Sequence, residues 1–178
     1  MASIAMARSK GKSMPLRSDW STAQCPIARS LDVVGDPWVL LIIRDVLHGR
    51  GRFDTLRDSL GISEAVLSRR LRDLVAAGLL SRVNYLDGNR TRQGYAATEA
   101  ACELLPILQQ LAIWGEKYTA MPADSGHMAL IHEACGGETT QGGVCSACGQ
   151  ELVPEAMGWV KPWRGAKDRL LPAGSLRT

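Results

Sequence analysis

The stretch SEAVLSRRLRDLVAAG, residues 63–78, has both ends and both faces of a short helix. Ser63 is a suitable N-cap, because its side-chain oxygen can accept a hydrogen bond from a free backbone N–H of the first turn. Gly78 suits the position after the last turn, where the backbone often becomes left-handed. The pattern predicts a helix over 63–77. Its apolar stripe consists of Leu67, Leu71, Leu74 and Val75.

The opposite face of this helix is small at its start and basic further along. It carries Ala65, Ser68, Arg69 and Arg72. Small side chains let a helix enter the major groove of DNA, and arginine can reach guanine edges or phosphates. An ordinary amphipathic helix with a solvated basic face is the alternative interpretation of this stretch alone.

The residues before Ser63 predict two further helices. Asp36-Pro37 supplies an N-cap and a first helical residue for an apolar helix that Gly49 ends. A shorter amphipathic helix follows over Arg52 to Leu60. Gly61-Ile62 then leaves only a tight turn before Ser63, an arrangement typical of a helix-turn-helix unit.

After Gly78 the apolar period changes from helical to alternating. Residues 80–85 and 91–98 alternate on either side of a turn that contains Asp87-Gly88, a strong hairpin signal. Arg90 and Arg92, at the tip and on the return strand, are positioned to contact DNA. Helix-turn-helix followed by a basic hairpin predicts a winged helix, and this succession favours DNA binding over a structural role.

The positive charge of the chain is concentrated in the same region. Residues 49–92 contain nine arginines and five acidic residues, a local net charge of +4 within a chain of net charge +3. A basic footprint inside a nearly neutral protein fits a surface that contacts phosphates. Arg52 and Ser63, near the starts of their helices, are further candidates for phosphate contacts.

The residues before the apolar helix divide into an arm and a helix. Residues 1–22 are polar and basic without periodicity, and we interpret them as a flexible arm. Cys25-Pro26 begins a helix to about Val34, with Cys25 at the N-cap. The positive end of the helix dipole favours a thiolate, and Arg29 adds positive charge, which makes Cys25 a candidate sensor thiol. Plain packing is the alternative for this cysteine.

A long helix is predicted from Glu99 to Tyr118, with Thr98 as its N-cap and a kink that Pro106 causes near residues 102–105. The rest of the chain is too short to cover the apolar side of this long helix once the winged unit has formed. A second subunit is therefore expected to cover it. The predicted dimer stripe consists of Leu104, Leu108, Leu111 and Tyr118.

Four residues beyond a linker over 122–126 have the spacing of a metal site. His132-x-x-Cys135-Gly and Cys145-x-x-Cys148-Gly read as two zinc knuckles that provide four ligands for one structural zinc ion. His127 is the alternative to His132, and free thiols in a loop are the alternative to metal binding. The predicted divisions are a body over 23–120, a zinc-knuckle module over 127–153 and a tail over 154–178.

Several classes of protein are excluded. No apolar run approaches the roughly 20 residues that span a bilayer, and the N-terminus lacks the apolar core of a signal peptide. Cytoplasmic residence with reduced thiols is therefore expected. The histidines at 48, 127 and 132 are not accompanied by a catalytic triad or a phosphate loop, so no enzyme is predicted.

The chain from Cys25 to Tyr118 resembles the HxlR-type family of bacterial winged helix-turn-helix transcriptional regulators. The likeness is carried by CPIARSLDVVGDPWVLLIIRDVLHG, RFDTLRDSLGISEAVLSRRLRDLVAAGLLSR, TRQGYAAT and LLPILQQLAIWGEKY. The resemblance implies a homodimer built from the N-terminal helices and the long helix. It also implies an oxidant-sensing cysteine or a response to aromatic compounds, as in some relatives. Gln93-Gly94 departs from the family pattern on the return strand.

The expected fold is therefore α+β and mostly helical: a winged helix-turn-helix with flanking dimerisation helices and a small zinc-ribbon-like appendage. The expected function is a homodimeric transcriptional regulator that reads a palindromic operator, with repression as the expected mode and activation as the alternative. An oxidant or a small molecule is the expected effector. A zinc-dependent protein-interaction adaptor that keeps the winged fold is the alternative function.

Overall fold

The computed structural model describes residues 19–120, 128–139, 143–153, 156–161, 166–169 and 172–176. Most of the predicted arm, His127 and the linker over 122–126 lie outside these residues. The helices are α1 (Pro26–Val34), α2 (Pro37–Leu47), α3 (Phe53–Leu60), α4 (Glu64–Ala76), α5 (Glu99–Cys102) and α6 (Leu105–Tyr118). The strands are β1 (Leu80–Asp87), β2 (Arg90–Ala97), β3 (Ala129–His132), β4 (Met157–Lys161) and β5 (Ala166–Arg169). The predicted α+β, mostly helical class is confirmed.

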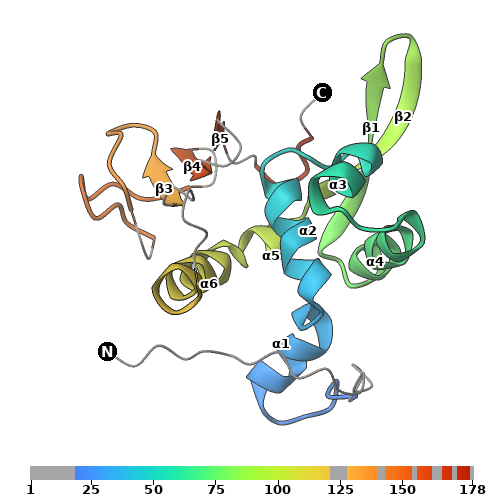
Figure 1. Ribbon diagram of the computed structural model, residues 1–178, viewed down its shortest axis with the longest axis horizontal. Coiled ribbons are helices and arrows are strands. Elements are labelled where there is room, and N and C mark those ends of the chain that lie inside the picture. Colours follow the sequence, from blue (N-terminus) through green and yellow to red (C-terminus); the bar gives the residue numbers. More distant parts are fainter. Residues whose placement is uncertain are drawn as a thin grey trace.

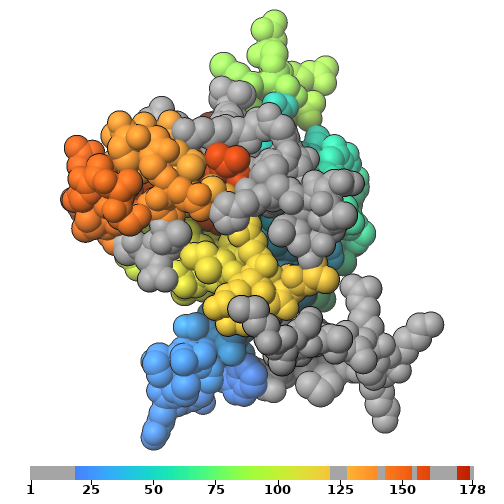
Figure 2. All heavy atoms as spheres, turned by 60° about the vertical axis from the view of Figure 1, so that its left-hand side comes forward, coloured from blue at the N-terminus to red at the C-terminus, as the bar shows by residue number. Residues whose placement is uncertain are grey.

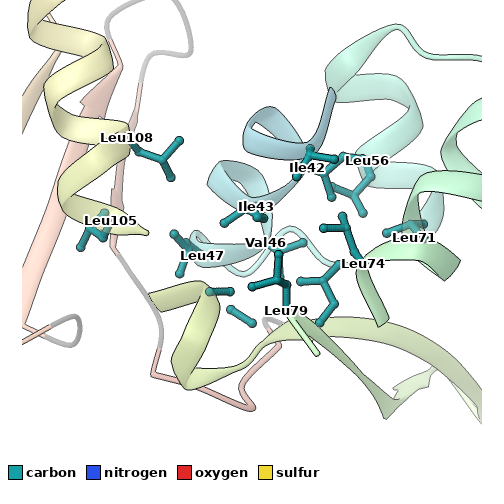
Figure 3. Close-up of a cluster of buried hydrophobic side chains, with 14 of the residues drawn as sticks. Ile42, Ile43, Val46, Leu47, Leu56, Leu71, Leu74, Leu79, Leu105 and Leu108 are labelled. Carbon is teal, nitrogen blue, oxygen red and sulfur yellow. The ribbon is translucent and has the colours of Figure 1, made fainter. Parts of the chain in front are cut away.

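The centre of the molecule is α2, which lies between α3 and α4 on one side and α6 on the other (Figure 1). Asp36 caps it by accepting a hydrogen bond from the backbone N–H of Trp38 at 3.0 Å, as predicted. Figure 3 shows Ile42 and Val46 among the leucines of α3 and α4. This helix is apolar nearly all round because other elements cover most of its circumference. Its buried apolar residues are Val39, Ile42, Ile43, Val46 and Leu47.

Polar contacts fix α2 against the helix-turn-helix. The Asp45 carboxylate is fully buried, and it accepts hydrogen bonds from Arg44 Nε at 2.9 Å and from the Ser59 hydroxyl of α3. Arg70 of α4 forms an ion pair with the Asp36 carboxylate. Arg70 is therefore part of the packing of α4 and does not belong to its exposed basic face.

The wing is an antiparallel hairpin of β1 and β2 that projects from the body (Figure 1). Asp87 pairs with Arg90, so the turn is Gly88-Asn89, and Gly88 has a left-handed φ of 59°. The strands reach closer to the tip than the alternating pattern alone predicted. At the base, the Tyr95 N–H donates to the Gly51 carbonyl at 2.9 Å, which ties β2 to the segment before α3.

The predicted long helix is broken into α5 and α6 at residues 103–104, within the region where a kink was expected. Thr98 caps α5 by accepting from the Ala101 N–H at 3.4 Å, and its hydroxyl donates to the Gly78 carbonyl at 2.8 Å. Pro106 lies in the first turn of α6, where its missing N–H would have no helical partner. The proline therefore starts a new helix after the break.

The predicted stripe of Leu104, Leu108, Leu111 and Tyr118 is not one uncovered surface. Leu108 is 7% exposed and faces the core together with Leu105 (Figure 3), and Leu104 is partly buried against the same core. Leu111 and Tyr118 are 48% and 49% exposed. The packing of the first turns of α6 against the core separates the two sets. Leu104 and Leu108 thus belong to the core of this chain.

The C-terminal part forms a three-stranded antiparallel sheet in the order β3-β4-β5 beside α6 (Figures 1 and 2). Since β3 pairs with β4, the predicted boundary at residue 154 divides a single sheet and does not separate two units. Trp159 of β4 is 2% exposed and lies edge-on to the His48 ring, with 5.1 Å between ring centroids. The sheet is thereby packed against the end of α2. None of the helices that the structure describes is long and apolar enough to cross a membrane.

The final described residues, 172–176, return to the base of the wing. The Gly174 N–H donates to the Ala97 carbonyl at 2.7 Å. The Leu176 side chain fills space beside Gly51 and Gly94: a Cβ on Gly94 would lie 2.6 Å from Leu176 Cδ2. Gly94, which departs from the family pattern, therefore makes room for the Leu176 side chain.

Candidate nucleic-acid interface and metal centre

The helix α4 presents two chemically distinct faces. Ser63 caps it, with its Oγ 3.5 Å from the Val66 N–H that donates to it. Leu67 and Leu71 are fully buried and Leu74 is 2% exposed, so the predicted apolar stripe is confirmed on these three positions. The predicted contact residues all lie exposed on the rest of the surface: Ala65, Ser68, Arg69 and Arg72. The helix therefore offers a small and basic surface that the fold leaves uncovered.

The turn between α3 and α4 is held by an arginine that sequence reasoning did not single out. Arg57 contacts Asp58 at 2.9 Å within α3 and Glu64 at 2.8 Å on the first turn of α4. Hydrogen bonds to Asp58 and Glu64 raise the pKa of the Arg57 guanidinium. Gly61, between the helices, has a left-handed φ of 62° that glycine adopts without strain. These contacts fix the angle at which α4 leaves the turn.

The wing carries the predicted arginines in different environments. Arg90 is exposed at the tip, and Arg92 is half-exposed and pairs with Asp87 at 2.8 Å. Arg52 reaches the same carboxylate at 3.1 Å, and its guanidinium lies 4.7 Å from the centroid of the Tyr85 ring. Arg52 thus connects the start of α3 to the wing, and the sequence did not reveal its partners Asp87 and Tyr85.

The four predicted metal ligands come together in space. The ligand atoms of His132, Cys135, Cys145 and Cys148 lie within 4.8 Å of one another. His132 Nδ1 is 3.4 Å from Cys135 Sγ and 3.3 Å from Cys148 Sγ, and the sulfurs of Cys135 and Cys145 are 3.8 Å apart. This arrangement can hold a metal ion.

The two halves of the cluster repeat the same backbone pattern. Gly136 N–H donates to the His132 carbonyl at 2.8 Å, and Gly149 N–H donates to the Cys145 carbonyl at 2.8 Å. Both glycines have left-handed φ values, 68° and 75°. The bridge between residues 131 and 138 has its counterpart between residues 144 and 151. Each half is thus a small hairpin that turns two ligands toward one point.

Two thiols of the cluster differ in acidity: burial and the neighbouring thiols raise the pKa of Cys148, whereas the pKa of Cys145 is lowered. Burial opposes ionisation of Cys145, which is 2% exposed, but hydrogen bonds from backbone N–H groups of Ala147 and Cys148 and from neighbouring thiols lower its pKa to about 6. In the other half, the Gly137 N–H lies 3.4 Å from Cys135 Sγ and donates to it. Backbone donors aimed at sulfur stabilise the thiolate form that binds metal.

The candidate sensor thiol has the predicted place at the start of α1. Cys25 occupies the N-cap position and is exposed, but its side chain makes no capping hydrogen bond. The Arg29 guanidinium donates to the carbonyls of Ala23 and Gln24, at 2.6 and 2.9 Å, and so holds the turn before the helix. Cys102 is less exposed, at the end of α5.

Comparison with known proteins places this arrangement in a family. Residues 33–122 match the HxlR-like helix-turn-helix family. An uncharacterised HTH-type transcriptional regulator of Mycobacterium tuberculosis is 37% identical over 127 residues, which cover 71% of this chain and 79% of that protein. One from Methanothermobacter thermautotrophicus is 29% identical over 106 residues, with coverage of 59% and 80%.

A solved structure agrees with the sequence matches. The crystal structure of PA1607, described as a candidate transcription factor, has a TM-score of 0.62 and 35% identity, and the match covers 78% of this chain and 96% of that one. The named relatives are transcriptional regulators, and no enzyme activity is expected of the chain. With the family match over α2 to α6, and α4 and the wing built as described, this chain belongs to the HxlR-like helix-turn-helix family of transcriptional regulators.

Proposed function

We propose that the protein is a homodimeric repressor that reads a palindromic operator with α4 in the major groove and the wing on the adjacent backbone or minor groove. The observation that carries this proposal is the exposed face of α4, where Ser68, Arg69 and Arg72 extend from a helix whose other face is buried. Small residues at the start of the helix allow close approach, and the arginines can read guanine or contact phosphate.

On the wing, Arg90 is the primary candidate for a DNA contact, with Arg92 beside it. Arg52 is a weaker candidate for a phosphate contact than the sequence suggested, because Asp87 and Tyr85 already engage its guanidinium. We assign it to supporting the wing. Ser63 remains a candidate phosphate contact through the free N–H groups at the start of α4.

The dimer is supported by two apolar surfaces for which the described chain provides no cover. None of the residues of α1 is buried, although the helix is amphipathic. Its apolar residues Ile27 and Leu31, one turn apart, are 70% and 47% exposed. On α6 the exposed apolar residues recur at helical spacing: Ile107, Leu111, Trp114 and Tyr118. Figure 2 shows α1 projecting from the molecule near α6. A second copy that packs on both surfaces would bury them and pair two recognition helices.

Zinc is the metal that the ligand set and the distances favour. Tetrahedral zinc, with bonds of about 2.3 Å to sulfur and about 2.0–2.1 Å to nitrogen, places two sulfurs about 3.8 Å apart and a sulfur and a nitrogen about 3.5 Å apart. The observed separations are 3.8 Å and 3.3–3.4 Å. With three cysteines and one histidine, the protein fills all four positions, so the zinc has a structural role.

For regulation we propose that Cys25 reacts with oxidants or electrophiles. Its thiol is exposed at the start of α1, the helix that the dimer would bury, so modification there can alter the spacing of the recognition helices. The test compares operator release on oxidation for the native protein and Cys25→Ser. Release that persists in the serine variant, or alkylation of Cys25 no faster than that of Cys102, would exclude this role.

Selection of bound sequences from random DNA tests the proposed function. We expect a palindrome whose half-sites are centred about 10 base pairs apart, because two-fold related recognition helices lie about 34 Å apart. A zinc-dependent interaction adaptor would enrich no sequence and would bind DNA weakly at every salt concentration. Failure to enrich any sequence in repeated selections with zinc-loaded protein would contradict operator recognition.

A further inference from the structure

The three thiols of the metal cluster differ in their access to solvent. Cys135 and Cys148 are exposed, whereas Cys145 is 2% exposed. The two hairpins that carry them lie on the opposite side of the molecule from α4 (Figure 1), and they form one edge of it in Figure 2. A small dissolved molecule can therefore reach Cys135 without any part of the chain unfolding.

The exposed Cys135 has the buried Cys145 directly beside it. Their sulfurs are 3.8 Å apart, although the two residues belong to different hairpins. Gly137 allows the hairpins to approach this closely, because a Cβ on Gly137 would lie 2.5 Å from the Cβ of Ala147 in the second hairpin. The Gly137 N–H also donates to Cys135 Sγ at 3.4 Å and so fixes its position. An accessible thiol next to a second thiol is the arrangement in which oxidation leads to a disulfide.

We propose that Cys135 and Cys145 form an oxidation site for hydroperoxides, separate from Cys25, at which the reaction links the two hairpins by a disulfide. The Cys135 thiolate attacks one peroxide oxygen, so that an S–O bond forms while the O–O bond breaks. Sulfur is oxidised to a sulfenic acid, and the peroxide is reduced to water or an alcohol with a proton from solvent. The Cys145 thiolate then attacks the Cys135 sulfur: the S–S bond forms, the S–O bond breaks, and the hydroxide takes up a second proton and leaves as water.

The disulfide and a bound zinc ion exclude each other. Tetrahedral zinc keeps two sulfurs about 3.8 Å apart, whereas the sulfurs of a disulfide are about 2.05 Å apart. The disulfide would leave His132 and Cys148 as the remaining ligands of the cluster, too few for a structural zinc site. Oxidation should therefore release the metal. This consequence rests on the proposed zinc ion, whereas the disulfide rests on the position of the sulfurs.

The reaction has an optical readout in the C-terminal sheet. His132 is the last residue of β3, and Trp159 of the neighbouring β4 packs on the His48 ring. Loss of the metal through oxidation should thus shift the fluorescence of Trp159 in the same direction as removal of the metal by a chelator.

The test uses the full chain with Cys25→Ser and Cys102→Ser, in which the cluster thiols are the only cysteines left. The zinc-loaded protein is treated with a small excess of hydrogen peroxide, and a chromogenic chelator records the zinc that is released. We expect one zinc ion released per disulfide, and recovery of bound zinc after reduction in the presence of added zinc.

Peptide mapping identifies the disulfide. Cleavage after Glu133 and Glu138 separates Cys135 from Cys145 and Cys148, and fragment masses under non-reducing conditions then show which cysteine is its partner. We expect the partner to be Cys145.

Two serine variants in this background provide the matched comparison, because each removes one thiol of the second hairpin and one metal ligand. Cys145→Ser should lower the yield of disulfide to Cys135 at least tenfold and leave Cys135 as a sulfenic acid that dimedone labels. Cys148→Ser should form the Cys135–Cys145 disulfide as fully as its parent. Since both variants lose one ligand, weaker zinc binding alone would affect them alike.

In the native chain, peroxide should oxidise Cys135 at least tenfold faster than the less exposed Cys102. The proposal is overturned if Cys135 reacts no faster than Cys102, if the disulfide joins Cys145 to Cys148, or if both serine variants form a disulfide to Cys135 in equal yield. The Cys135–Cys145 disulfide in a protein that holds no zinc would support the oxidation site and contradict the metal assignment. The measurements need no DNA, so they are independent of operator recognition.

Discussion

At the scale of single residues, two glycines at the base of the wing lie where any side chain would collide, but with different neighbours. A Cβ on Gly51 would lie 1.7 Å from the backbone oxygen of Tyr95, whereas a Cβ on Gly94 would meet the flexible side chain of Leu176 at 2.6 Å. The backbone cannot yield without breaking the Tyr95–Gly51 hydrogen bond, but the far end of the flexible Leu176 side chain can move.

We therefore expect Gly94→Ala to lower the free energy of unfolding by about 1–3 kcal/mol through overpacking. Leu176→Ala should remove most of that cost in the double variant, which a double-mutant cycle measures as a coupling of about 1 kcal/mol or more. Gly51→Ala is the matched control: it should cost at least as much and should not be rescued by Leu176→Ala. Additive effects of Gly94→Ala and Leu176→Ala in thermal unfolding at fixed protein concentration would contradict this contact.

At the scale of elements, local signals predicted the helix starts well. Asp36, Ser63 and Thr98 all cap the helices that the sequence assigned to them, because a cap depends on residues within one turn. The clustering of the four candidate metal ligands was also predictable, because each half of the cluster is a local turn with fixed spacing. Long-range partners were not predictable: the packing of Trp159 on His48 and the pairing of β3 with β4 join residues that no short pattern connects.

We expect the C-terminal sheet to depend on the proposed zinc ion for its stability. The segment is too short for a core of its own, and a metal supplies folding free energy in such cases. We expect one zinc ion per chain by elemental analysis of protein purified without chelator. Removal of zinc should expose Trp159 and shift its fluorescence to longer wavelength, since the sheet that carries it would lose its shape.

Cys148→Ser should lower zinc affinity strongly, whereas Cys102→Ser should leave the stoichiometry at one, because Cys102 lies on α5 and is not among the clustered ligands. Stoichiometry near zero together with free titration of Cys135, Cys145 and Cys148 would contradict the zinc assignment.

At the scale of the whole molecule, one face of α6 packs in the core and the other face is exposed. Leu108 completes the core of the chain, and Leu111, one turn further, is exposed beside Trp114. The sequence placed both leucines on one stripe because their spacing is helical, and periodicity alone does not show which side of the helix packs on α2. Burial by α2 decides which leucine is available to a second subunit.

We expect a dimer in sedimentation at micromolar concentration, and Leu111→Asp should convert it to a folded monomer, because a charge would be placed in the proposed interface. Leu108→Asp should instead unfold the protein, since it buries a carboxylate in the core. Leu86→Asp, on the wing where residue 86 is 69% exposed, should leave the dimer intact. A native protein that sediments as a monomer would exclude the proposed dimer.

The most direct test of DNA recognition by α4 is the affinity for the selected operator, measured by fluorescence anisotropy between 50 and 200 mM salt. We expect a steep loss of affinity with salt from counterion release. Arg69→Ala or Arg72→Ala should cost about 1–3 kcal/mol on the operator and relax one base position, if that arginine reads guanine. Lys117→Ala, on α6, should change little. Unchanged operator affinity in both arginine variants, with a flat salt dependence, would contradict recognition by this helix.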